Sequence, residues 1–293
     1  MDRTKALAGL ISAACALAGC RSNNAIRVGS KNFTEQVVLG EIIAQHLEHR
    51  LNTKVERRLN LGGTLLAHQA LLSGQIDLYP EYTGTALTVV LKEPINTDPS
   101  AVLARVRAEY ERRFQVDWLD PLGIDNGFAM VIRGADAREK HLATLTDASK
   151  VAVPWALGVG YEFEQRADGK GALQATYKLP VNGAAKTMDL GLLYKALEQN
   201  QVSMIAANAT DGLLAKMDLV VLEDDRHAFP PYQVGIAARE DRERAVPGLK
   251  EALLELSGKL TNLKMRALNY QVDGEHRAVE QVAGEFLRQA GLR

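Results

Sequence analysis

The chain has 293 residues, 46% of them hydrophobic, which is enough apolar material for two modest lobes, each with its own core. Its 35 basic and 36 acidic residues nearly cancel and no basic stripe stands out, so nucleic acid is not expected as a partner. Aromatic residues make up only 5% of the chain, so the places where they cluster are informative.

The first twenty residues have the features of an export signal. A short basic start, MDRTK, precedes the apolar segment ALAGLISAACALA, which is too short to cross a bilayer. The stretch LAGC resembles the lipobox of bacterial lipoproteins, in which the cysteine becomes the lipidated first residue. With Cys15 inside the apolar segment of the signal, Cys20 is the only cysteine left in the mature chain, and a single thiol cannot form an internal disulfide. We therefore expect residues 1–20 to be a lipoprotein signal peptide and a lipid on Cys20 to tether the protein to a membrane; an uncleaved anchor or a plain signal peptide is the alternative.

From Ala25 onward, strand-like and helical patterns alternate. AIRVGS predicts a buried strand, and NFTEQVVLGEIIAQHLEHRL predicts an amphipathic helix, with Asn32 as N-cap and Glu35 completing a capping box. The segments that follow predict a strand in KVERRLNL, a helix in GGTLLAHQALLSG, a short strand in QIDLYPEY that Pro80 ends, and a helix over 98–114.

A second set of strands begins near DPLGIDNGFAMVIR. It contains the strand-like segments VAVPWAL, VSMIAAN and LVVLEDD, and FPPYQVGIAARE then crosses back before two long C-terminal helices. Strands that alternate with helices favour an α/β fold with largely parallel sheets. We expect lobe 1 to comprise residues 25–124 and 234–293, lobe 2 to comprise residues 125–233, and a ligand cleft to lie between them.

Signatures of catalysis are missing from the sequence. It has no G-x-S-x-G, no Walker A motif and no H-E-x-x-H, and its six histidines are dispersed, so we expect no catalytic residues, metal site or cofactor. Glu162 and Glu164 are interpreted as a solvated acid pair rather than a glycosidase dyad. Without a nucleophile and base, a surface-anchored hydrolase is disfavoured.

A set of aromatic and small polar residues falls where the lobes should meet. Each has an ordinary structural explanation when taken singly, but together they suit one chemistry. A quaternary ammonium has no N–H to donate, so ring faces hold it by cation–π attraction of about 0.5–2 kcal/mol per contact. Amides, hydroxyls and a helix N-terminus suit the polar tail of such a ligand. The residues are Gln36, Tyr82, Thr85, Asn126, Phe128 and Tyr232.

Several motifs, in order from about Ile26, closely resemble the substrate-binding proteins of osmoprotectant ABC importers, the glycine betaine/carnitine/choline group. They are VGSKNFTEQVVLGEI, NLGGT, IDLYPEYTGTAL, WLDPLG, EFEQRADG, MDLGLLYKAL, TDG and LEDDRHAFPPY. The resemblance implies a two-lobed periplasmic-binding-protein fold, type II-like, that closes around its ligand and delivers it to an ABC permease in the membrane. The expected protein is a monomer without cofactors, periplasmic or at the cell surface.

The resemblance also implies an aromatic cage around a trimethylammonium head. Tyr82 and Tyr232 match cage tyrosines, and Phe128 stands where the family usually has tyrosine. Polar contacts of the family are matched by Gln36, Thr85 and Asn126.

Asn208 departs from the family pattern, because typical members carry tyrosine there. Losing one ring should cost about 1–2 kcal/mol, roughly tenfold or more in affinity, unless the departure signals a different ligand. Tyr161, Trp155 and Tyr79 are candidates to replace the missing ring, although Tyr79 lies inside a predicted strand and is expected to pack. Asp211 is expected to cap the helix that follows it.

Two further alternatives stay open. The same binding module suits a different amino-acid-derived ligand, such as a thiol-histidine betaine, with Asn208 hydrogen-bonding it. A sensory binding protein without a transport role is the other.

Overall fold

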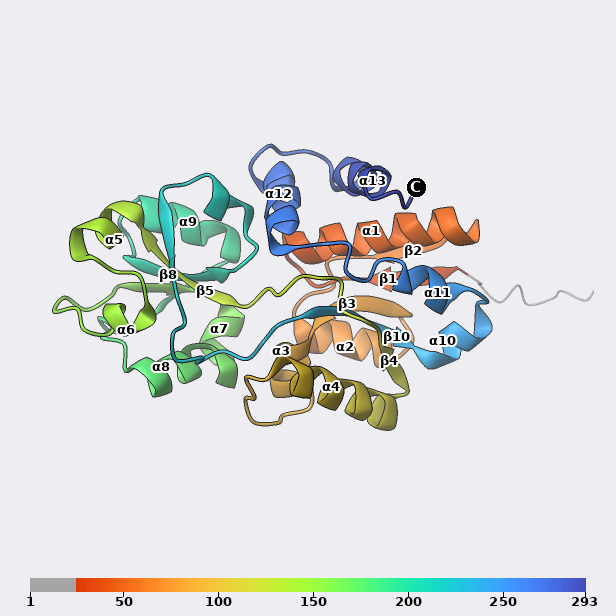
Figure 1. Cartoon of the computed structure of the whole chain (residues 1–293), viewed down its shortest axis with the longest axis horizontal. Coiled ribbons are helices and arrows are strands. Elements are labelled where there is room, and N and C mark those ends of the chain that lie inside the picture. The colour runs from red at the N-terminus through yellow and green to blue at the C-terminus, as the bar shows by residue number, and fades with distance from the viewer. Residues whose placement is uncertain (1–24) are drawn as a thin grey trace, which may run out of the picture.

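The computed structural model describes residues 25–293, which form two lobes, each built on a five-stranded sheet (Figure 1). The predicted lipidation site, Cys20, lies outside these residues. Within them, no helix is both long enough and apolar enough to cross a membrane.

The sheet of the first lobe has the order β2-β1-β3-β10-β4. Strand β10 runs antiparallel to both of its neighbours, and the other four strands share one direction. The strands are β1 (Ile26–Gly29), β2 (Val55–Arg58), β3 (Leu78–Tyr82), β4 (Val116–Trp118) and β10 (Val234–Arg239). The helices of this lobe are α1 (Thr34–Leu51), α2 (Thr64–Leu72), α3 (Thr83–Thr85), η1 (Ala86–Val90), α4 (Pro99–Phe114), α10 (Glu240–Ala245), α11 (Leu249–Leu254), α12 (Asn262–Asp273) and α13 (Val279–Gln289).

The sheet of the second lobe has the order β7-β6-β8-β5-β9, and again one strand, β5, runs against its neighbours. Its strands are β5 (Phe128–Arg133), β6 (Leu157–Val159), β7 (Lys186–Thr187), β8 (Met204–Asn208) and β9 (Leu219–Leu222). Its helices are α5 (Gly134–Lys140), α6 (Leu145–Ala148), α7 (Tyr161–Gln165), η2 (Ala167–Gly171), α8 (Ala172–Tyr177), α9 (Leu190–Glu198) and η3 (Gly212–Ala215).

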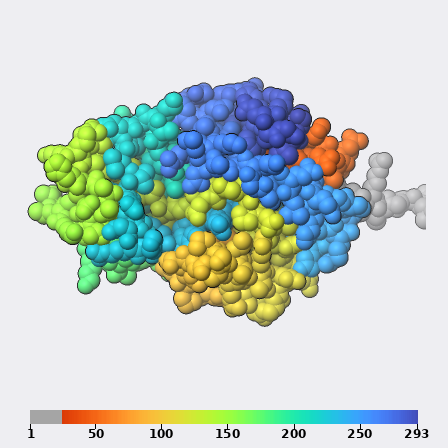
Figure 2. Space-filling view, viewed as in Figure 1, coloured from red at the N-terminus to blue at the C-terminus, as the bar shows by residue number. Residues whose placement is uncertain are grey.

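Two segments cross between the lobes side by side. An antiparallel bridge joins Asp125 to Gln233, and the N–H groups of Asn126 and Val234 donate to the carbonyl groups of Tyr232 and Ile124 at 3.1 and 3.0 Å. Each segment continues directly into the antiparallel strand of one sheet, β5 or β10. The largely parallel sheets are therefore as predicted, with one reversed strand in each where the chain arrives from the other lobe. Figure 2 shows the lobes in contact across the visible face.

Of the two helix N-caps predicted from the sequence, one is confirmed and one is wrong. Asp98 caps α4 by accepting from the N–H of Ser100 at 2.9 Å, as predicted. The capping box at Asn32 is wrong, because α1 starts only at Thr34 and Glu35 turns into the protein, where it is 2% exposed.

Two predicted element ends are also wrong. Pro80 lies within β3 rather than ending it. A proline has no N–H to donate to a neighbouring strand, but β1 pairs with β3 only at Leu78, so on the β1 side of the sheet no strand needs that hydrogen bond at Pro80. The first long C-terminal helix is divided into α11 and α12, with Gly258 at positive φ between them.

Candidate functional site

A cleft of about 660 Å³ lies between the lobes, within the range of roughly 300–1,000 Å³ typical of small-molecule sites. Six of the seven predicted ligand-binding residues line it, namely Tyr82, Thr85, Asn126, Phe128, Asn208 and Tyr232. The seventh, Gln36, does not. It is fully buried below the wall, and its Oε1 accepts from the N–H of Lys31 at 3.1 Å.

Three rings of the predicted set stand on strand ends or on a crossing. Tyr82 is the last residue of β3, Phe128 is the first residue of β5, and Tyr232 precedes β10. The rings of Phe128 and Tyr232 meet edge to face with centroids 5.6 Å apart, and Tyr82 stacks on Phe33 at 6.2 Å. The cleft therefore has aromatic walls from both lobes.

Lys31 lies against the wall of the first lobe. Its Nζ is 4.5 Å from the ring centroid of Tyr82 and 2.6 Å from Oε1 of Glu81. Both charged side chains are almost completely buried. The ring face of Tyr82 thus already contacts a cation, which is the interaction a quaternary ammonium would also make.

Arg166 lies against the opposite aromatic wall. Its guanidinium carbon is 5.0 Å from the ring centroid of Phe128 and 5.7 Å from that of Tyr232. It pairs with Asp168 at 2.6 Å and donates to Oγ1 of Thr85, across the cleft, at 3.1 Å. Burial disfavours both charges, but their mutual attraction outweighs it, raising the pKa of Arg166 and lowering the pKa of Asp168.

Glu35 is a hydrogen-bonding centre for both lobes. Its carboxylate accepts from the hydroxyl of Tyr82 at 2.7 Å, from Nδ2 of Asn126 at 2.9 Å, and from the hydroxyl of Thr210 in the second lobe. Burial raises the pKa of Glu35, against the effect of these donors. Asn126 therefore holds Glu35 with its amide, while its Oδ1 accepts from the N–H of Thr210 at 3.2 Å.

Asn208 ends β8 directly beside Phe128, its partner in register on β5. Its N–H donates to Oδ2 of Asp211 at 3.1 Å, and the hydroxyl of Tyr194 donates to the same oxygen at 2.8 Å. The prediction that Asp211 caps the next helix is wrong, because its side chain makes no bond to η3 and points instead to these donors. Burial raises the pKa of Asp211 to about 6.

Several cleft residues were missed by reasoning from the sequence. Glu162 is not simply solvated: it lines the cleft, and its Oε1 accepts the N–H of Thr64 at 3.1 Å, at the start of α2 in the other lobe. Lys31, Glu35 and Arg166 lie inside motifs that carry the family resemblance, and that position was the available signal. Lys31 and Glu35 are hard to assign because their partners Glu81 and Tyr82 are 50 and 47 positions away in the chain.

The candidates to replace the missing ring separate clearly. Tyr161 lines the cleft and is 57% exposed, so it stands at the rim. Trp155 and Tyr79 are buried and do not line the cleft, and the packing role predicted for Tyr79 is confirmed by its 0% exposure.

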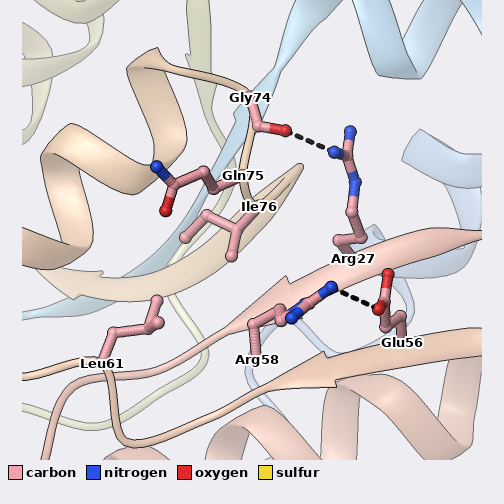
Figure 3. A pocket seen from close by; sticks show the side chains of 7 residues that line it. All are labelled: Arg27, Glu56, Arg58, Leu61, Gly74, Gln75 and Ile76. Carbon is pink, nitrogen blue, oxygen red and sulfur yellow. Dashed lines mark hydrogen bonds and ion pairs between the residues drawn. The ribbon is translucent and has the colours of Figure 1, made fainter.

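A second hollow of about 440 Å³ lies on the first lobe, and Arg27 and Arg58 are among the residues that line it (Figure 3). Arg27 donates to the carbonyl of Gly74 and pairs with Asp77 at 2.6 Å, and Arg58 pairs with Glu56 at 2.5 Å. Because both arginines are paired locally and no aromatic residue lines this hollow, the cleft is the stronger ligand site.

Two α/β lobes, two chain crossings and an interlobe cleft define the class of extracytoplasmic solute-binding proteins. Residues 24–289 match the family model described as "Substrate binding domain of ABC-type glycine betaine transport system", and the chain belongs to this family. The family consists of substrate-binding transport proteins, not enzymes.

Individual relatives agree with this membership. The carnitine transport binding protein OpuCC of Listeria monocytogenes is 34% identical over 95% of this chain and 92% of its own. The ergothioneine transport permease/ergothioneine binding protein EgtU of Helicobacter pylori is 32% identical over 90% of this chain and 47% of its own. A crystal structure of a glycine betaine/carnitine/choline ABC transporter protein has a TM-score of 0.78 and 29% identity, over 91% of this chain and 99% of the other.

Proposed function

We propose that the protein captures a betaine-type quaternary ammonium compound, such as glycine betaine, carnitine or choline, and delivers it to an ABC permease. The observation that carries the proposal is the presence of two cations and three aromatic rings in one interlobe cleft. The rings Tyr82, Phe128 and Tyr232 would hold the trimethylammonium head by cation–π attraction. Lys31 and Arg166 would hold the carboxylate.

Titration calorimetry with glycine betaine, carnitine and choline tests the ligand class. Saturable 1:1 binding is expected, with glycine betaine tighter than choline because choline has no carboxylate for Lys31 and Arg166. Flat titrations across the whole panel would overturn the ligand class but not the fold.

A different amino-acid-derived ligand is the second candidate, and it is favoured by Asn208 at a cage position and by the ergothioneine in the name of one relative. In this case the Asn208 amide would hydrogen-bond the ligand instead of leaving a gap in the cage. Asn208→Tyr separates the two: a gain in glycine betaine affinity supports the weakened cage, and loss of binding of a histidine-derived betaine supports the hydrogen bond.

We also propose that residues 1–20 are a lipoprotein signal peptide and that a lipid on Cys20 anchors a monomer to the membrane on the periplasmic or cell-surface side. The LAGC motif supports this. Mass spectrometry of the mature N-terminus should find an acylated Cys20, and Cys20→Ala should release the protein from membranes. An unmodified N-terminus would contradict the anchor.

The lobe borders are proposed at 124/125 and 233/234. The bridge between Asp125 and Gln233 supports them, since hinge bending would then concentrate at one pair of neighbouring residues.

A further inference from the structure

The cleft continues past its aromatic wall into a region with acidic side chains and no paired cation. Asp211 and Asp273 both line it, and among residues 25–293 neither forms an ion pair. Their hydrogen-bond donors are neutral: Asn208 and Tyr194 for Asp211, and the hydroxyl of Thr34 for Asp273, at 2.6 Å. By contrast, the cleft cations Lys31 and Arg166 each have a carboxylate partner of their own.

A buried acceptor without a partner lies in the same region. Asn269, on α12, lines the cleft and is 2% exposed, and its Nδ2 donates to the carbonyl of Thr210 at 2.9 Å. Its Oδ1 is buried and has no hydrogen-bond partner within the described chain. A buried polar atom of this kind is costly unless something donates to it.

Asn208 connects the region to the aromatic wall. It is the register partner of Phe128 on the neighbouring strand, and its backbone and side chain both approach Asp211. A ligand whose head group lies on the ring of Phe128 therefore has Asn208 next to it on the side of β8. From there a substituent reaches Asp211 and the α12 residues of the other lobe.

We infer that Asn208, Asp211, Asn269 and Asp273 form a second subsite, which binds a basic N–H-bearing group on the side chain of an amino-acid-derived betaine. The inference rests on the proposed function, and it adds a second recognition element to the same cleft. An ammonium or guanidinium group would give the two carboxylates a cationic partner and would also donate a hydrogen bond to Oδ1 of Asn269. An organic cation suits the subsite better than a metal ion, because no group of three metal-ligating side chains is gathered anywhere in residues 25–293.

A matched pair of ligands tests the subsite in the full chain. The α-trimethylammonium betaine of lysine carries a terminal ammonium, and the betaine of 2-aminoheptanoic acid has the same length with a methyl group in its place. Calorimetry should show the lysine betaine binding at least tenfold more tightly, as expected for one charge-assisted contact. Glycine betaine serves as the reference for the head group.

Aspartate variants test whether the subsite causes the preference for the lysine betaine. Asp211→Asn and Asp273→Asn should each reduce the ratio of the two affinities at least threefold, and Asp120→Asn, on the exposed surface, should leave the ratio unchanged. Because Asp211 also holds the turn after β8, near-ultraviolet circular dichroism checks its fold, and Asp273→Asn alone is sufficient for the test.

The outcomes are distinct. Binding of glycine betaine together with equal affinity for the two long betaines would overturn the subsite and leave the proposed function standing. A preference for the lysine betaine that survives in both variants would overturn the subsite in the same way. No binding of any of the three betaines, nor of carnitine or choline, would overturn the proposed function and the subsite with it.

Discussion

Arg166 and Asp168 illustrate how single residues shape the cleft. The side chain of Asp168 is fully buried and pairs with Arg166, and the hydroxyls of Thr88 and Tyr232 each donate to it at 2.8 Å. Since Thr88 belongs to the first lobe and Asp168 to the second, the hydrogen bond from Thr88 to Asp168 also joins the lobes. Removing one member of a buried pair leaves an uncompensated charge, which costs more than the pair itself contributes.

Replacing Arg166 by Met should therefore lower the free energy of unfolding by about 3 kcal/mol, measured by urea denaturation. Adding Asp168→Asn should restore part of the loss, since the orphaned charge is then gone. Arg138→Met is the matched control, because Arg138 pairs with Asp218 on the surface, with both side chains 66% exposed, and should cost less than about 1 kcal/mol. Equal losses in both arginine variants would contradict this account.

The raised pKa of Asp211 predicts a specific pH dependence. Below about pH 6 the folded protein holds a proton on Asp211, whereas the unfolded chain releases it above its ordinary value of 3.8. The contribution of Asp211 to stability is therefore largest below about pH 4 and falls by up to about 3 kcal/mol as the pH rises to 6. The difference in unfolding free energy between wild type and Asp211→Asn, measured by denaturation from pH 4 to 8, should decline over this window and then level off. A difference in unfolding free energy that stays constant with pH would contradict the raised pKa of Asp211.

At the scale of elements, the turn from β8 into η3 is a main contact between the lobes. It packs on α12 of the first lobe, where Nε of Arg266 donates to the carbonyl of Ala209 at 2.7 Å. Gly212 is required by this approach, because a Cβ there would lie 2.4 Å from the backbone nitrogen of Tyr270. Backbone against backbone leaves no flexible side chain to move aside.

Gly212→Ala should consequently hold the lobes apart while each lobe stays folded. We expect a larger radius of gyration in small-angle X-ray scattering and a betaine affinity reduced about tenfold, from a clash of about 1–3 kcal/mol. Gly171→Ala is the control, since nothing lies within 4 Å of a Cβ at that position. An unchanged radius of gyration and affinity in Gly212→Ala would show that the turn moves to accommodate the Cβ, and would contradict this prediction.

For the whole molecule, the two neighbouring crossings permit one lobe to rotate against the other while both sheets stay intact. Contacts across the cleft then belong to the closed arrangement: Glu35 with Thr210, Arg166 with Thr85, and Glu162 with the start of α2. A ligand that contacts both lobes favours this arrangement over the open one.

Ligand binding should therefore stabilise the protein as a unit. At a betaine concentration one hundred times the Kd, the free energy of unfolding should rise by about 2.7 kcal/mol, or roughly 5–10 °C in Tm. Thermal denaturation with glycine betaine measures this, with glycine at the same concentration as the control that lacks the quaternary head. A Tm unaffected by a betaine that calorimetry shows to bind would contradict closure around the ligand.

Reasoning from the sequence predicted much of the fold and the aromatic part of the cleft. The two strand sets, the cap at Asp98 and the position of Tyr82 at a strand end follow from local patterns of polarity and backbone chemistry. It failed at Glu35, Asp211 and Glu162, which have local explanations as a capping residue or a solvated acid. Each of them instead bonds a partner in another element: Glu35 with Tyr82, Asp211 with Tyr194, and Glu162 with Thr64.

What the sequence by itself determined was the alternation of strands and helices, the family, and the rings expected at the lobe junction, because these depend on neighbouring residues and on recognisable motifs. Only the tertiary structure decided which groups the charged side chains of the cleft contact across it. Glu35 meets Thr210 across 175 positions of the chain, and Arg166 meets Thr85 across 81. Buried charges persist only where polar partners are brought to them, so these hydrogen bonds of Glu35 and Arg166 follow from the way the two lobes meet.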